Sequence, residues 1–318
     1  MADVVKTIGV GGGEDYSTMT LWEADLDSGA IYASGDVAIG KLTDAGDHTT
    51  IGVNINGGGT IGLSQIYLMC DDGAYHGGIA GAGARVISST VAVTIIQSAP
   101  ATDVCVCDFE ITATVDRTTA LHFGGAAAGF TLNIRRMLIH DTTNATDAIG
   151  AINMQSSNYA QANILRNILH DITVRNLTGY LAYGIRVWNN LPTLVANNTI
   201  HHVNATSRHR EAVGLYLTGT GANVQAHNNI VTDTVGDDAD VDYSWGTGSH
   251  THNLSSDWTA TGTGSITLVT SADQFVSTTG GSENLHLKAG ADALEAGTDL
   301  GTDDEINVDI DQDTVSGT

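Results

Sequence analysis

Short apolar runs return along the middle of the chain at a nearly constant interval. In one series the separation is about 31 residues each time: Leu138, Leu169, Ile200 and Val231. A second series is spaced by about 30–33 residues: Leu121, Ile152, Ile185 and Leu215. A period of this length is typical of stacked repeats, each of which adds one layer to a continuous core.

Within each repeat the runs have the length and alternation of β-strands. The segments 121–123, 152–154, 185–187 and 215–217 alternate apolar and polar residues, so that one face of each strand points inward. Gly, Asn and Thr interrupt the runs every few residues, which excludes the i, i+3, i+4 spacing of helical repeats. Coils of about 31 residues with two or three short strands predict an all-β solenoid, a right-handed parallel β-helix.

Asparagine recurs between two of these strands. Asn167, Asn198 and Asn229 are separated by the same interval, and Arg136 stands one step earlier on the same period. Asn tolerates the left-handed backbone of a tight corner, and its side-chain amide can hydrogen-bond to the amide of the next coil. We therefore expect these residues to stack at one corner. The alternative, that they only mark loops, does not explain the constant spacing.

Composition agrees with this fold and restricts the partners. The chain has 318 residues and only 2 Pro, as expected where proline would interrupt the backbone hydrogen bonds of a sheet. With 36 Asp and Glu against 12 Lys and Arg, the net charge of −24 repels phosphates, so neither nucleic acid nor an anionic membrane is an expected partner. Such a charge suits salty water, which favours a marine or halophilic source.

Two further observations concern the cell compartment. Three cysteines give no disulfide framework, and Cys105 and Cys107 are predicted to point together into the core as small apolar residues. Residues 1–8 contain no apolar segment of a secretory signal, and no uninterrupted apolar stretch is long enough to span a bilayer. We expect synthesis in the cytoplasm without a signal peptide, and no insertion into a membrane.

Both ends of the chain resemble known β-helix proteins. Residues 12–18 (Gly-Gly-Glu-Asp-Tyr-Ser-Thr) and 21–24 (Leu-Trp-Glu-Ala) are similar to the opening of pectin-lyase-like β-helix proteins, where a turn leads into a short helix that plugs the first coil. Ser17 or Thr18 can cap this helix, and Leu21 and Trp22 can form its apolar lid.

Residues 285–290 and 296–299 resemble the closing segment of bacterial and phage β-helix proteins, although residues 291–295 read Ala-Asp-Ala-Leu-Glu where Ser-Pro-Ala-Ile-Asp is usual. The resemblance implies the pectin-lyase-like right-handed parallel β-helix superfamily, of the kind found in bacteriophage structural proteins. It divides the chain into an N-terminal cap (1–45), a parallel β-helix (46–270), and a C-terminal cap with an acidic tail (271–318). It does not specify chemistry, because one fold supports many functions.

Carboxylates are the first candidates for chemistry, since polysaccharide hydrolases need a pair about 5–10 Å apart. Four aspartates crowd one loop: Asp237, Asp238, Asp240 and Asp242. Such a run is more typical of a solvated bulge, and we assign no catalytic residue to it.

A lyase would instead need a cation, with Arg, Lys, His or Tyr as base. Basic residues of the repeat region are Arg135, Arg136, Arg166, Arg175 and the cluster Arg208-His209-Arg210. Histidines also recur, at His140-Asp141, His170-Asp171 and His201-His202. We expect the histidines to form an outward row, which could bind a metal or act as a base but more often repeats a solvent-facing position.

Asp309, Asp311 and Asp313 supply oxygen ligands at alternate positions near the end of the chain, a candidate structural calcium site. The alternative is an acidic, solubilising tail. No other cofactor is expected.

The absence of an evident active site favours a non-enzymatic virion structural protein of a tailed bacteriophage, a capsid decoration protein in first place. Its expected partners are other virion proteins and copies of itself, a trimer being one arrangement. The alternative is a tailspike or fibre-like receptor-binding protein with polysaccharide depolymerase activity, lyase or hydrolase, acting on a cell-surface glycan. Exposed aromatic residues should then line one face, but Trp188, Tyr216, Trp245 and Trp258 are scattered in the sequence.

Overall fold

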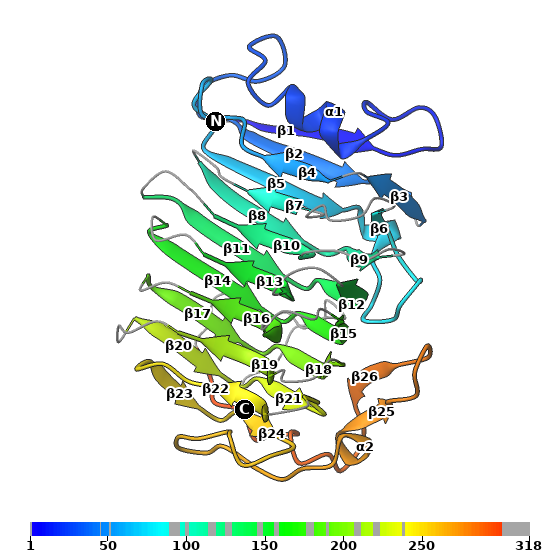
Figure 1. Cartoon of the computed structure of the whole chain (residues 1–318). Coiled ribbons are helices and arrows are strands. Elements are labelled where there is room, and N and C mark those ends of the chain that lie inside the picture. The colour runs from blue at the N-terminus through cyan, green and yellow to red at the C-terminus, as the bar shows by residue number, and fades with distance from the viewer. Residues whose placement is uncertain are drawn as a thin grey trace.

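The chain forms a parallel β-solenoid in which successive coils stack on one another (Figure 1). The computed structural model describes residues 2–44, 46–50, 52–88, 96–98, 102–113, 119–124, 129–144, 149–155, 159–175, 181–188, 191–206, 211–218, 223–236 and 239–300. Within these residues the complete coils contribute one strand to each of three parallel sheets, which we call sheets A, B and C, while the two ends of the solenoid contribute only to some of them.

Sheet A has nine strands: β1 (Asp3–Ile8), β2 (Val37–Leu42), β5 (Gln65–Cys70), β8 (Asp103–Cys107), β11 (Thr131–Arg135), β14 (Gln161–Leu165), β17 (Thr193–Ala196), β20 (Val224–His227) and β23 (Ser249–Thr251). Sheet B has eight: β3 (Asp47–Thr50), β6 (Arg85–Ser88), β9 (Glu110–Ala113), β12 (Leu138–Asn144), β15 (Ile168–Val174), β18 (Thr199–Ala205), β21 (Ile230–Thr232) and β24 (Leu254–Ser255). Sheet C has seven: β4 (Val53–Ile55), β7 (Ile96–Ser98), β10 (Leu121–Phe123), β13 (Ile149–Met154), β16 (Ala182–Val187), β19 (Glu211–Leu217) and β22 (Ala239–Ser244).

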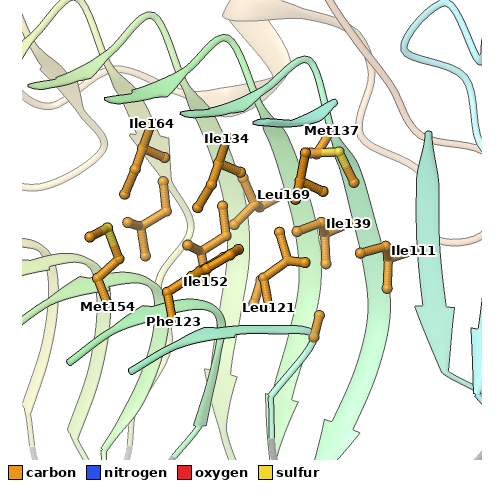
Figure 2. Packing of buried hydrophobic residues seen from close by; sticks show 14 of the residues in the cluster. Ile111, Leu121, Phe123, Ile134, Met137, Ile139, Ile152, Met154, Ile164 and Leu169 are labelled. Atoms are coloured by element: carbon orange, nitrogen blue, oxygen red, sulfur yellow. The ribbon is translucent and has the colours of Figure 1, made fainter. Parts of the chain in front are cut away.

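The inward side chains form a continuous apolar spine, as the alternation predicts. Leu121 pairs with Ile152, Ile152 with Ile185, and Ile185 with Leu215, so this predicted series is confirmed. All four side chains are fully buried. Figure 2 shows Leu121 and Ile152 facing isoleucines from the other two sheets across the interior of the coil. Burial of about 25 cal/mol per Å² of apolar surface makes this spine the main source of stability.

The predicted series Leu138, Leu169, Ile200 and Val231 is wrong by one residue at its first member. Leu138 pairs with Ile168, and Ile139 pairs with Leu169, because this coil is one residue shorter than the two that follow it. Arg136 therefore does not share the column of Asn167, and Met137 stands there. Its backbone N–H donates to Asn167 Oδ1 at 3.0 Å.

The predicted asparagine corner is confirmed and extends by one residue beyond the prediction. Asn167, Asn198, Asn229 and Asn253 are fully buried. In each step the backbone N–H and the Nδ2 of one Asn donate to Oδ1 of the next, at 2.8–3.1 Å. We call this row the asparagine ladder; it ends where Asn253 N donates to Ser265 Oγ.

The residue before each ladder asparagine makes the turn. Asn197 and Asn228 both have φ of +57°, the left-handed conformation that Asn adopts more readily than most residues. Arg136 and Arg166 occupy the equivalent position with φ of +49° and +56°.

Cys70 belongs to the central apolar cluster, but Cys105 and Cys107 do not. Cys105 and Cys107 are fully buried and free, yet they alternate with Val104 and Val106, which do belong to the central apolar cluster. The prediction that the pair points into the core was therefore wrong: it lies on the opposite face of sheet A.

The helix predicted near the N-terminus is α1 (Met19–Ala24). Thr18 Oγ1 accepts from Leu21 N, so Thr18 is its N-cap. Trp22 is fully buried against Gly40 of β2, where a Cβ would lie only 2.7 Å from the indole ring. Leu21 is 53% exposed and so does not contribute to the expected apolar lid.

The C-terminal region folds back along the solenoid. Besides α1, the helices among the described residues are η1 (Asp72–Ala74) and α2 (Ser271–Gln274). Helix α2 leads into an antiparallel hairpin of β25 (Phe275–Ser277) and β26 (Asn284–Leu287). Farther on, Thr298 exchanges two hydrogen bonds with the Asn228 side chain, at 2.8 and 2.9 Å. The division at residues 45 and 270 stays a prediction; β1 and β2 already belong to sheet A.

Candidate functional site

Sheet B carries the stacked histidines on its outer face. His140 pairs with His170 and His170 with His201, one on each of β12, β15 and β18. The rings of His140 and His170 are stacked at 5.0 Å between centroids and 10° between planes. The predicted row exists, but the three residues are only 2–5% exposed, so the expectation of a solvent-facing row was wrong.

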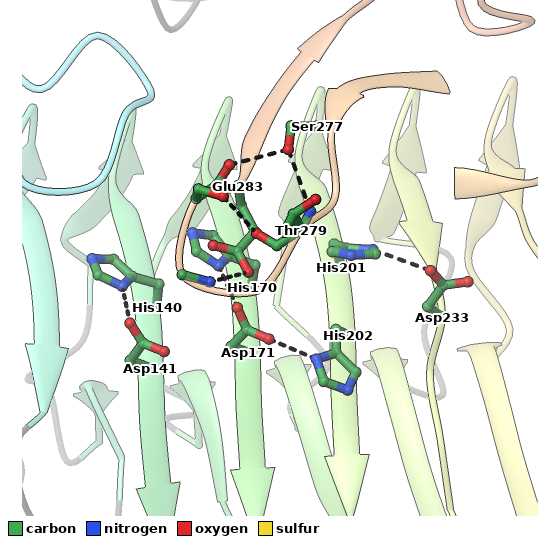
Figure 3. Close-up of polar contacts among 12 residues, drawn as sticks. His140, Asp141, His170, Asp171, His201, His202, Asp233, Ser277, Thr279 and Glu283 are labelled. Atoms are coloured by element: carbon green, nitrogen blue, oxygen red, sulfur yellow. Dashed lines mark hydrogen bonds and ion pairs between the residues drawn. The ribbon is translucent and has the colours of Figure 1, made fainter. Parts of the chain in front are cut away.

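A local distortion of each strand brings a histidine and the following residue together. Asp141, Asp171 and His202 have φ of +49°, +53° and +57°, and strand pairing skips them. In a regular strand, neighbouring side chains point to opposite faces. The left-handed residue breaks this alternation, and His170 Nδ1 comes to lie 2.9 Å from Asp171 Oδ2 (Figure 3).

His140 is closed between two carboxylates. Its Nε2 lies 2.7 Å from Glu110 Oε1 and its Nδ1 lies 2.8 Å from Asp141 Oδ2. Because both carboxylates accept, both ring nitrogens must carry protons. Burial lowers the pKa of His140, but these two contacts outweigh it and raise the pKa to about 9. This arrangement is a buried ion bridge that leaves neither nitrogen for chemistry.

His170 has different surroundings. Asp171 Oδ1 also lies 2.6 Å from Nδ1 of His202, a half-exposed residue. Burial raises the pKa of Asp171, but the hydrogen bonds from His170 and His202 bring it well below its usual value. Glu283, which directly precedes β26, approaches from the hairpin: ligand atoms of His170, Asp171 and Glu283 lie within 4.8 Å of one another.

The hairpin covers this face through an apolar contact. Phe275 and Leu285 pack with Leu138 and Ile168, whose side chains point outward from sheet B. The Phe275 ring also meets His201 edge-on at 6.0 Å between centroids. The hairpin residues lie far along the chain from β15 and have no periodic pattern, so no signal in the sequence indicated this cover.

The predicted aspartate loop is only partly described. Asp237 and Asp238 lie outside the described residues, and Asp240 is exposed on β22. Asp242 is 1% exposed and accepts hydrogen bonds from the backbone N–H groups of Thr234 and Ser256. Burial raises the pKa of Asp242 to about 6. Its role in this arrangement is to hold two backbone segments together.

The predicted basic residues that the structure describes lie in separate environments and form no common site. Arg136 forms a two-pronged ion pair with the buried Asp108, at 2.6 and 3.0 Å. Arg166 is buried, and Arg175 is exposed just after β15. The cluster at 208–210 lies outside the described residues, as do the calcium candidates Asp309, Asp311 and Asp313.

Sheet C presents a cluster that sequence reasoning missed. The Arg186 guanidinium lies 3.9 Å from the centre of the Trp188 ring and 5.2 Å from that of Tyr183. Trp188 is 56% exposed, whereas Arg186 is 6% exposed. The register places Asn153 and Tyr216 beside Arg186 on the adjacent strands. Asn153 is 4% exposed, and its Oδ1 has no hydrogen-bond partner among the described residues.

The signal for this cluster was available in the sequence. Residues 153, 186 and 216 each follow a member of the confirmed spine series by one position, so all three had to face outward on neighbouring strands. An alignment of the coils on the buried series would have placed Tyr216 beside Arg186, although the two residues are far apart in the sequence.

Comparison with known proteins found no family model, no curated protein and no solved structure that matches this chain. Among the described residues, no helix is long and apolar enough to cross a bilayer.

Proposed function

We propose that this protein is a non-enzymatic structural protein of a tailed bacteriophage virion, a decoration protein of the capsid surface made in the host cytoplasm. Its partners in this proposal are other virion proteins and further copies of itself, with a trimer as one arrangement. The observation that carries the proposal is how the fold uses its titratable side chains.

Among the described residues, several of the groups that the sequence offered for acid–base chemistry hold the solenoid together. His140 is clamped between two carboxylates, and Arg136 is paired with a buried aspartate. Asp242 accepts backbone N–H groups in a buried position. A general acid or base must reach a substrate proton within hydrogen-bond distance, and these groups are already bound to the protein. Contacts of this kind stabilise a rigid solenoid, and a rigid solenoid suits a structural role.

The proposal extends to the finer description of the fold. We take the solenoid to wind in the right-handed sense, as parallel β-strand crossovers do almost without exception, and to be of the pectin-lyase-like kind. In this description α1 is the cap of the first coil. Its buried Trp22 on Gly40 and the bonds from Asn56 N and Gly57 N to Glu23 Oε1 support that role.

The test is mass spectrometry of purified phage particles from the source, followed by immunogold electron microscopy with an antibody against the chain. We expect the polypeptide in the particles, with label on the head. Particles that lack the polypeptide would refute a virion role, and label confined to the tail would refute the capsid assignment.

A second candidate is binding, and in its enzymatic form cleavage, of a cell-surface glycan by a receptor-binding protein. The cluster on sheet C favours it, because an exposed indole beside a guanidinium is suited to stacking on a sugar ring and to bonding its hydroxyl groups.

A glycan array with the intact chain tests this candidate. Trp188→Ala should abolish binding, whereas Trp258→Ala, which removes a tryptophan that is 74% exposed elsewhere, should leave it unchanged. Equal binding by both variants would exclude the sheet C cluster as the glycan site. Release of reducing ends from a bound glycan would decide for a depolymerase over the non-enzymatic proposal.

A further inference from the structure

The group formed by His170, Asp171 and Glu283 is the strongest cluster of potential ligands among the described residues, and it lies apart from sheet C. His170 and Asp171 come from β15, and Glu283 comes from the hairpin (Figure 3). We propose that these three side chains bind one divalent transition-metal ion, for which zinc is the best match, and that the ion fixes the hairpin to sheet B. This inference does not depend on the proposed function.

The distances are close to those of a formed site. Three atoms that are all within 4.8 Å of one another fit inside a circle whose radius is at most about 2.8 Å. Zinc is bound by nitrogen and oxygen at about 2.0–2.2 Å. Movements of less than about 1 Å by each ligand atom would therefore bring all three to bonding distance of one ion.

The surroundings hold these ligands in place. His170 is 2% and Glu283 is 8% exposed, and the apolar contact of Phe275 with Ile168 keeps the hairpin against β15. Asp171 also contacts His202, and Glu283 Oε1 accepts from Gly281 N at 3.0 Å. Metal-binding side chains in proteins are commonly oriented by such outer hydrogen bonds.

The neighbouring coil shows what distinguishes the site. His140 and Asp141 repeat the geometry of His170 and Asp171, with a contact of 2.8 Å in place of 2.9 Å. There, however, the second carboxylate is Glu110, bonded to the other ring nitrogen, and Asp141 is 61% exposed on its side chain. Only around β15 do two carboxylates and an imidazole converge on one point among the described residues.

The donor set selects the class of ion. Calcium and magnesium bind oxygen ligands, whereas an imidazole nitrogen beside carboxylates suits zinc and other first-row transition metals. With three protein ligands, water completes the coordination. Because β15 and the hairpin supply ligands from distant parts of the chain, a bound ion links two segments that otherwise meet mainly through the small apolar contact.

The first experiment uses the intact chain, stripped of metal with a chelator and dialysed into about 0.15 M salt so that the acidic surface does not collect ions. Zinc chloride is titrated by calorimetry, and thermal unfolding is followed in parallel. We expect one equivalent to bind and the unfolding midpoint to rise with zinc concentration. No heat and no rise would overturn the proposal, and so would displacement of zinc by an equal concentration of calcium.

Matched variants locate the ion. Glu283→Gln should weaken zinc binding by more than the roughly 10–100-fold that loss of an outer partner causes, and His202→Gln should weaken it within that range. Asp141→Asn is the control, because it makes a comparable change one coil away without Glu283 beside it. Wild-type affinity of Glu283→Gln, or an equal loss in Asp141→Asn, would refute the assignment. Circular dichroism without metal checks that each variant is folded.

Hydrogen exchange tests the structural role. In the wild-type chain, zinc should slow exchange of the amides of β25 and β26 by at least about tenfold, because those strands can then open only after the ion is released. Glu283→Gln should remove this protection. Protection confined to β15 would refute the view that the ion fixes the hairpin.

Discussion

Replacing Asn198 by alanine removes the middle of the asparagine ladder. Asn198 Oδ1 accepts from both N and Nδ2 of Asn167, at 3.0 and 2.8 Å. Its Nδ2 donates to Ile164 O at 2.8 Å and to Asn229 Oδ1 at 2.9 Å. The side chain is fully buried, so water does not replace these partners in the folded protein.

The size of the effect follows from the groups left behind. A buried polar group that loses its partner costs about 1–3 kcal/mol. Alanine strands the Asn167 N–H and removes one of the two acceptors of Asn167 Nδ2, which keeps its bond to Ile134 O at 3.2 Å, so we expect a loss of about 2–4 kcal/mol in the free energy of unfolding. Asn198→Asp should cost more at pH 7, because the new carboxylate oxygen would face Ile164 O in place of a donor.

Urea denaturation of the intact chain measures the loss, with hydrogen exchange at the ladder to detect coils that open separately. The control is Asn197→Gly, which keeps the left-handed backbone, with φ of +57°, and leaves the ladder amides in place. We expect the control to change stability by less than about 1 kcal/mol. A loss below about 1 kcal/mol in Asn198→Ala would refute the view that the ladder amides are a large stabilising element.

Three other perturbations have defined outcomes. Phe275→Ala should free the hairpin to proteolysis and cost about 3–5 kcal/mol locally, whereas Val276→Ala, at a residue 56% exposed, should do neither; equal cleavage would contradict this. Gly40→Ala should lower the melting temperature through a loss of about 1–3 kcal/mol, because its Cβ would lie 2.7 Å from Trp22; an unchanged value would contradict the packing. Burial raises the pKa of Asp242 to about 6, so the folded state holds this proton more tightly than the unfolded state does. The free energy of unfolding of the wild type should therefore fall by up to about 3 kcal/mol, relative to that of Asp242→Asn, as pH rises from about 4 through 6. Urea denaturation over this pH range measures both, and parallel pH profiles of the two proteins would refute the prediction.

The solenoid was predictable from the sequence because its signal is periodic and strong. Leu121, Ile152, Ile185 and Leu215 paired as expected, and the asparagine corner formed with its amides aligned. The misplacement of Arg136 came from assuming a constant coil length. The two His-Asp pairs, at 140–141 and 170–171, already stand one residue closer together than the ladder asparagines and so indicated the shorter coil.

The candidate site was only half predictable. The stacking of His140 on His170 follows from the period, but their burial does not, because the covering hairpin joins sheet B through single apolar contacts such as Phe275 on Ile168. Contacts of this kind depend on shape in three dimensions and leave no spacing rule in the sequence. For the same reason, the sequence did not indicate that Glu283 lies beside His170.

The asparagine ladder also makes the length of the column adjustable. Each ladder asparagine accepts through Oδ1 from the preceding coil, or donates through N and Nδ2 to the following coil, in the same pattern. Excision of residues 168–198 would therefore place Asn167 next to Asn229 and preserve these hydrogen bonds. Whole coils can thus be lost or duplicated without stranding a buried amide, whereas removal of part of a coil would break the row. We therefore expect such a chain to tolerate insertions and deletions in units of one turn.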